Sequence, residues 1–89
     1  MATEIHCRSI SQQVEDDLID LHTFLDHELN GTIPSRSLFP NGESRRRAFV
    51  WFRKIDAAIT SAEGFNSVIK EVPYNINPAW YIRDLLLRR

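Results

Sequence analysis

Apolar residues recur at helical spacing in the first third of the chain. Between about residues 11 and 29 they stand four, three, four and four positions apart, at Val14, Leu18, Leu21, Leu25 and Leu29. These intervals place all five on one face of an α-helix. Ser9 followed by Gln12 offers a capping box, and Asn30-Gly31 offers a pair that can adopt the left-handed conformation that ends helices. The pattern predicts a first helix from about Ser11 to Leu29.

A loop and a second helix are predicted next. Residues 30–42 hold two glycines and two prolines and are expected to form the loop, within which Leu38-Phe39 is apolar enough to pack on the core. The second helix is expected from about Glu43 to Thr60 or Ala62, with Gly64 closing it. Its apolar face repeats at helical spacing, with Trp51 and Ala58 as flanking residues: Ala48, Phe52, Ile55 and Ile59.

The last third predicts two shorter helices. A segment from about Phe65 to Val72 is amphipathic and stops at Pro73. Asn77 then places a favoured cap ahead of a proline at the first position of a final helix, residues 78–89. Since no Val- or Ile-rich alternating run predicts a strand, we expect an all-α fold. This fold is a small single-domain bundle of about four to five helices over residues 1–89, with residues 1–10 as a flexible N-terminal segment.

Composition limits the class of protein. With 89 residues, 43% of them apolar and 26% charged, the chain has the balance of one folded domain. Its single cysteine, Cys7, cannot form an internal disulfide, which favours a reducing compartment. The N-terminus lacks the basic start and apolar run of a signal peptide, and no apolar stretch approaches the ~20 residues that span a bilayer. We therefore expect a cytoplasmic protein with no membrane partner.

Charge is divided between the two halves of the chain. Residues 1–43 carry two basic and eight acidic side chains, a net charge of −6, whereas residues 44–89 carry nine basic and four acidic ones, a net charge of +5. The whole chain is −1 because the halves nearly cancel. Such segregation bears on partners and association rather than on fold.

The helical pattern predicts where these charges lie. The first helix should present acidic side chains to solvent: Glu15, Asp16, Asp20, Asp26 and Glu28. The second helix should carry a basic strip away from its apolar face, consisting of Arg46, Arg47, Arg53 and Lys54. Two arrangements remain open: the strips face each other within the bundle, or they face outward and apart.

Large aromatic side chains extend this picture. Phe49 falls roughly 80–100° from the centre of the second helix's apolar face, and Trp80 and Tyr81 cannot both face inward on the last helix. An exposed aromatic residue rimmed by arginines is typical of a protein contact site.

Known catalytic and cofactor patterns are missing. His6, Cys7, His22, Asp26 and His27 are metal-ligand types, but their spacing is not that of a zinc site. Cys7 has no nucleophile elbow, and the three glycines form no phosphate-binding loop. The acidic residues of the first helix are expected to face water, so they do not form the buried carboxyl pair that acid–base catalysis uses. We expect no enzymatic activity, no cofactor, no metal and no small-molecule substrate.

Two classes of macromolecular partner are left. Five positive charges at Arg45, Arg46, Arg47, Arg53 and Lys54 could contact phosphates, but the sequence pI of about 6.3 is low for a nucleic-acid-binding domain. We therefore predict a non-enzymatic protein–protein interaction module, an adaptor or inhibitor with separate acidic and basic faces, whose partners include a second copy of itself. The alternatives are a small nucleic-acid-binding regulator that uses helix 45–54, and a phage or plasmid inhibitor whose acidic helix mimics phosphates. The predicted partner-binding residues are Asp16, Asp20, Asp26, Arg46, Arg47, Phe49, Arg53 and Lys54.

The second half of the chain also resembles a known family. A tryptophan-bearing helix, a short apolar segment and an Asn-Pro turn occur here as Trp51, Val68-Ile69 and Asn77-Pro78, over roughly residues 45–86. In this order they resemble the effector-associated domains of prokaryotic conflict systems, which are similar to the death-fold adaptors. The interval from Trp51 to Asn77 is longer than the family pattern leads us to expect, and the first half matches only in being helical. The resemblance implies a non-enzymatic module that recruits partners by like-with-like domain contacts.

Overall fold

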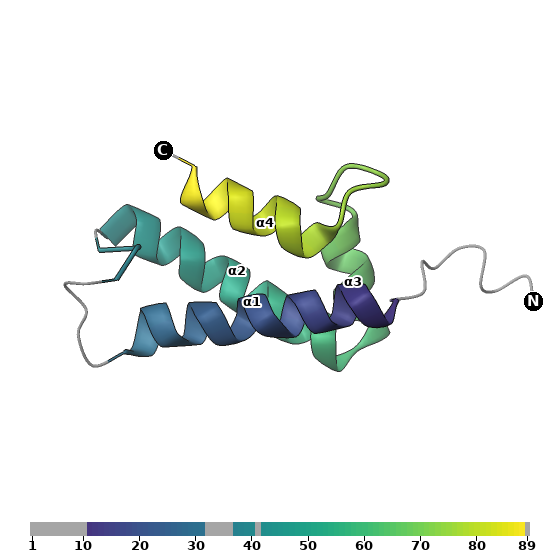
Figure 1. Cartoon of the computed structure of the whole chain (residues 1–89), viewed down its shortest axis with the longest axis horizontal. Helices are drawn as coiled ribbons and strands as arrows, with labels where there is room; N and C mark the ends of the chain where they lie inside the picture. The colour runs from purple at the N-terminus through teal and green to yellow at the C-terminus, as the bar shows by residue number, and fades with distance from the viewer. Residues whose placement is uncertain (1–10, 32–36, 41, 89) are drawn as a thin grey trace, which may run out of the picture.

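A computed structural model describes residues 11–31, 37–40 and 42–88 of the chain. Within these ranges it contains four α-helices and no strand: α1 (Gln12–Asn30), α2 (Gly42–Thr60), α3 (Ala62–Ile69) and α4 (Pro78–Leu87). The chain traces α1 in one direction, returns along α2, turns through α3 and runs back along α4 (Figure 1). The predicted all-α bundle is confirmed. The N-terminal segment predicted to be flexible, residues 1–10, lies outside the described residues.

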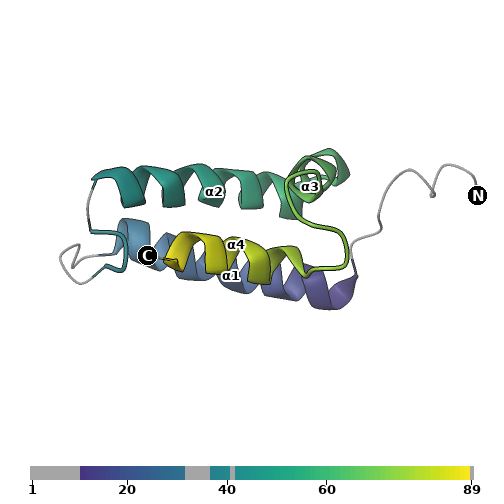
Figure 2. The same cartoon turned by 90° about the horizontal axis from the view of Figure 1, so that it is seen from above.

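The core lies between α2 on one side and α1 and α4 on the other (Figure 2), and α3 adds Phe65 and Val68 to it. The predicted stripe of α1 is buried at Leu18, Leu21, Leu25 and Leu29. The inward face of α2 is rotated from the predicted one: Trp51 and Ala58 are buried with Ala48 and Ile55, whereas Phe52 and Ile59 are half-buried. Besides α1, both α3 and α4 pack against α2.

The ends of α1 differ from the predicted ones. Ser11 is its N-cap, and its hydroxyl accepts a hydrogen bond of 3.2 Å from the backbone N–H of Val14; the predicted cap, Ser9, lies outside the described residues. Gly31 has φ −70°, so the prediction of a left-handed helix end is wrong. The end of α1 is held from outside instead, because the guanidinium of Arg45 in α2 donates to the carbonyl of Leu29. A basic side chain at this position also suits the negative end of the helix dipole.

Gly64 does not end α2, which corrects the prediction. α2 stops at Thr60, and Ser61 caps α3 by accepting a hydrogen bond of 3.0 Å from the backbone N–H of Gly64. Gly64 therefore lies in the first turn of α3, where a Cβ atom would meet the backbone carbonyl of Ala57. The missing side chain lets α3 approach α2 closely.

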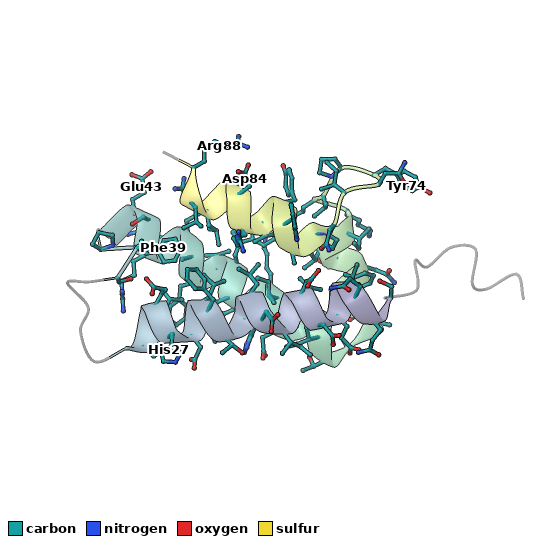
Figure 3. All side chains as sticks on the ribbon, viewed as in Figure 1. His27, Phe39, Glu43, Tyr74, Asp84 and Arg88 are labelled. Atoms are coloured by element: carbon teal, nitrogen blue, oxygen red, sulfur yellow. The ribbon has the colours of Figure 1, made fainter. Side chains whose placement is uncertain are left out.

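The loop between α1 and α2 reaches the core, as predicted. Phe39 is buried and points into the bundle, where its ring meets that of Phe24 edge to face at 6.4 Å (Figure 3). The carboxylate of Glu28 accepts hydrogen bonds from the backbone N–H of Leu38 and from the hydroxyl of Ser37. An acidic residue expected on the solvent side of α1 thus anchors the loop.

Asn77 connects the start of α4 to α1. Its side-chain oxygen caps the helix by accepting a 2.9 Å hydrogen bond from the N–H of Ala79, and its Nδ2 donates to Asp17 at 2.8 Å. Pro78 follows at the first helical position, so the predicted start of the last helix is confirmed.

We expect Asn77→Ala to lower the free energy of unfolding by about 1–2 kcal/mol, because it removes both the cap and the hydrogen bond to Asp17. Urea denaturation followed by circular dichroism measures this change. Asn77→Asp separates the two contributions, since it keeps the cap acceptor but places a second carboxylate beside Asp17. A loss with alanine below about 0.3 kcal/mol would contradict a linking role for this residue.

Candidate interaction surfaces

The structure separates the three predicted acidic residues of α1. Asp16 and Asp20 are exposed and lie only about 40° apart around the helix, whereas Asp26 lies about 120° from Asp20. Asp16 accepts a hydrogen bond from Gln12 and Asp26 accepts one from Asn30, each 2.9 Å long and within the helix. Asp16 and Asp20 therefore share one surface, and Asp26 belongs to another.

The predicted basic strip of α2 also divides. Arg46, Arg47 and Arg53 are all exposed, but Arg47 borders a separate depression on the α4 side that Leu86 also lines. Lys54 is engaged in contacts within the chain. Its Nζ lies 2.8 Å from a carboxylate oxygen of Glu71 and 4.6 Å from the ring centre of Trp51. Two of the four predicted cations thus remain on one surface.

Arg46 and Arg53 flank two exposed apolar side chains. Phe49 is 43% exposed and Val50 is 46% exposed, and both border the same open depression as the two arginines. The ring of Phe49 also contacts Phe52 edge to face, with 6.1 Å between centres. We call Arg46, Phe49, Val50 and Arg53 the basic α2 patch. Its centre is apolar and its rim is positive.

A second surface lies between α1 and α4 as a groove of about 310 Å³. Asp17, Asp20 and Phe24 line it on the α1 side, at intervals of three and four residues. Asp17 is half-buried through its contact with Asn77, whereas Asp20 is exposed. The α1 wall therefore presents two acidic side chains followed by an aromatic one. We call this depression the α1–α4 groove.

The α4 wall of the groove carries its most exposed apolar group. Trp80 is 73% exposed, and Arg83 and Leu87 follow it at intervals of three and four residues. Leu38 from the α1–α2 loop also lines the groove and is 49% exposed. An exposed tryptophan beside other accessible apolar side chains is the kind of group that anchors protein contacts.

Ion pairs do not join the two predicted charged strips. Among the described residues the ion pairs are His22 with Asp56, Lys54 with Glu71, and Arg88 with Asp84. None connects an acidic side chain of α1 to a basic side chain of α2. The sequence left open whether the acidic and basic strips face each other or face outward. In the structure Asp16 and Asp20 on α1 face outward, and so do Arg46 and Arg53 on α2.

The last of these pairs lies on the outer side of α4 (Figure 3). Arg88 donates a 2.7 Å hydrogen bond to Asp84, four residues earlier, and this bond raises the pKa of Arg88. Both side chains are exposed, so the pair contributes little to stability.

His22, a ligand type in the sequence, faces α2 instead of forming a metal site with Asp26. Its ring stacks on Phe52 with 4.4 Å between centres, and its Nε2 lies 3.2 Å from an oxygen of Asp56 without hydrogen-bond geometry. In the described part of the chain, no three His, Cys, Asp or Glu side chains gather as metal ligands. His6 and Cys7 lie outside the described residues.

The groove was missed by sequence reasoning, although one signal for it was present. Trp80, Arg83 and Leu87 repeat at helical spacing on the last helix, and the pattern allowed only one of Trp80 and Tyr81 to face inward. The structure exposes Trp80 and half-buries Tyr81. The opposite wall comes from α1, about sixty positions earlier in the chain.

No protein-family model, curated protein or solved structure matches this chain. The resemblance to effector-associated domains therefore stays a prediction. Among the helices of the described ranges, none is long and apolar enough to cross a membrane.

Proposed function

We propose that this protein is a non-enzymatic interaction module that binds a protein partner through two separate surfaces, the basic α2 patch and the α1–α4 groove. The observation that carries the proposal is the exposure of apolar side chains on both surfaces: Phe49 and Val50 on the first, Trp80 and Leu87 on the second. Each set is rimmed by charged side chains. Apolar centres with polar rims are typical of protein contact sites.

The charged side chains at the rims of the two surfaces allow the protein to discriminate between partners. Arg46 and Arg53 give the α2 patch a positive rim, and Asp20 gives the groove a negative one on its α1 side. Exposed ion pairs contribute only about 0–1 kcal/mol each, so the apolar centres must supply most of the affinity. The charged rims then set orientation and the rate of encounter. With a single cysteine in its sequence, the protein is proposed to act in the reducing cytoplasm.

The double variant Arg46→Glu with Arg53→Glu should abolish binding of partners that use the α2 patch, because it reverses the sign of the rim. The measurement is affinity capture from the native host after nuclease treatment, compared with the wild-type bait by quantitative mass spectrometry. Both positions are exposed, so the free energy of unfolding should change by less than about 0.5 kcal/mol per substitution.

Lys70→Glu with Arg88→Glu is the matched control. It changes net charge by the same amount at exposed positions outside both surfaces. Equal loss of partners with both double variants would mean that net charge matters rather than the patch. Unchanged capture with the α2 variant would remove the patch from the proposed function.

Nucleic acid remains the competing partner for the same patch, because arginines beside an exposed phenylalanine also suit phosphates and bases. Against it, Lys54 is paired with Glu71 and Arg47 lies on another side of α2. The positive surface is therefore smaller than the sequence alone predicts. A mobility-shift titration at low salt separates the classes: retardation of a generic duplex or single strand at about 10 µM protein would favour nucleic acid.

A further inference from the structure

We propose that the α1–α4 groove binds the basic α2 patch of a second copy of this chain, in a head-to-tail contact. The inference rests on the proposed function, and it names the partner and the two surfaces that meet. The observation that favours a second copy as the partner is the charge complementarity between these two surfaces of the same chain. One surface has a positive rim around an apolar centre, and the other has acidic side chains on its α1 wall and exposed apolar side chains on its α4 wall.

The residues of the basic α2 patch lie on one face of a single helix, which is a shape that a groove can accommodate. Its residues Arg46, Phe49, Val50 and Arg53 stand at positions i, i+3, i+4 and i+7 of one helix. They therefore form a single face about 10 Å long, with a cation at each end and apolar side chains between. Amphipathic helices that bind in grooves place apolar anchors at this spacing; here the two central positions are apolar and the two outer ones are cations.

The groove matches this face in its apolar part. Trp80 and Leu87 on α4 and Phe24 on α1 offer apolar surface to Phe49 and Val50 of the second copy. Trp80 is 73% exposed in the isolated chain, so the contact would cover a large aromatic surface that otherwise faces water.

Charges fix the orientation of the contact. Asp20 lies in the groove and Asp16 lies one turn earlier on the same side of α1, and both are exposed. Arg83 on the α4 wall is positive and repels a second cation. The arginines of the incoming patch are therefore directed to the α1 wall. Asp17 contributes less, because Asn77 and Gln13 already donate hydrogen bonds to its two oxygens.

The two surfaces lie on different sides of the bundle, which makes the contact heterologous. The patch is on α2, whereas the groove is formed by α1 and α4 on the other side of the core (Figure 2). One copy can then bind a neighbour at each surface. Contacts of this kind build closed rings or open chains rather than a two-fold dimer.

Sedimentation velocity of two single-surface variants tests this arrangement. The patch variant is Arg46→Glu with Arg53→Glu, and the groove variant is Asp20→Asn with Trp80→Ala. All four positions are exposed, so circular dichroism should show wild-type helix content. We expect the wild-type chain to associate at low salt, and each variant to associate at least about tenfold more weakly, which corresponds to about 1.4 kcal/mol.

A mixture of the two variants distinguishes a head-to-tail contact from a two-fold contact. Each variant retains one intact surface, so an equimolar mixture should form a heterodimer that cannot grow further. A two-fold contact, which uses both surfaces of both copies at once, would not be restored in the mixture. Association should also weaken as salt rises, because the screening length falls from about 10 Å at 0.1 M to about 3 Å at 1 M.

Different failures point to different errors. A wild-type chain that stays monomeric at about 1 mM and low salt, or variants that do not complement, would overturn the head-to-tail contact. If partner capture from the host still depends on Arg46 and Arg53 in that case, the proposed function stands with another protein as the occupant. If capture does not depend on them either, the α2 patch is removed from the proposed function as well, and only the groove is left as a candidate surface.

Discussion

Replacing Phe39 by alanine is expected to lower the free energy of unfolding by about 3–5 kcal/mol, although this residue lies in a loop. Phe39 is 1% exposed and is among the largest fully buried side chains of the core. Alanine would leave a cavity between the helices and remove the edge-to-face contact with Phe24. Because small domains are stable by only about 5–15 kcal/mol, the variant would be partly unfolded on warming. Urea denaturation with an unchanged m-value measures the loss.

The neighbouring residue provides the control for this prediction. Leu38 precedes Phe39 in the same loop but is 49% exposed, so Leu38→Ala should cost less than about 1 kcal/mol. If the two variants were equally stable, the loop would not be packed on the core. The α1–α2 connection would then be a simple tether, and the hydrogen bonds from Ser37 and Leu38 to Glu28 would have little effect.

The helices could be predicted from the sequence because their signals are local. The α1 stripe Leu18, Leu21, Leu25 and Leu29 states a helical period directly, and Asn77-Pro78 combines a cap with a proline suited to a helix start. Phe39 was also predicted to pack on the core, because an apolar pair inside a polar loop has few other places to go. Each of these signals is contained within one helix or one loop.

The contacts between helices could not be predicted in the same way. Glu28 and Arg45 were expected to be surface charges, but in the fold Glu28 anchors the loop and Arg45 donates a hydrogen bond to the carbonyl of Leu29 near the end of α1. Both roles depend on how α2 returns along α1. A charged residue near a helix end has the same local pattern whether it faces water or another segment.

Of the two candidate surfaces, the sequence predicted the one that lies on a single helix and missed the one that several segments form together. The patch lies on one helix, so its arginines and the outward position of Phe49 follow from helical geometry. The groove needs α1, the loop at Leu38 and α4 together, and no local pattern specifies their contact. Lys54 does not belong to the patch because its Nζ lies 2.8 Å from a carboxylate oxygen of Glu71, seventeen positions later in the chain.

Gly64 is the second residue whose replacement should have a large effect. We expect Gly64→Ala to lower the free energy of unfolding by about 2–3 kcal/mol, even though alanine is the better helix former by about 1 kcal/mol. The new Cβ would meet the carbonyl group of Ala57 and lie 2.9 Å from the Cβ of that residue. Two of these three atoms belong to the α2 backbone, so a side-chain rotation cannot relieve the clash. The helices themselves must move apart.

That movement would spread into the core. Phe65, which follows Gly64, and Val68 are the buried residues of α3, and both are positioned by the close approach of α3 to α2. Gly42→Ala is the matched control, because no atom lies within 4 Å of its Cβ and its φ is not positive. It should leave stability unchanged or raise it by up to about 1 kcal/mol. If Gly64→Ala behaved like Gly42→Ala in urea denaturation, the close packing of α3 on α2 would be refuted.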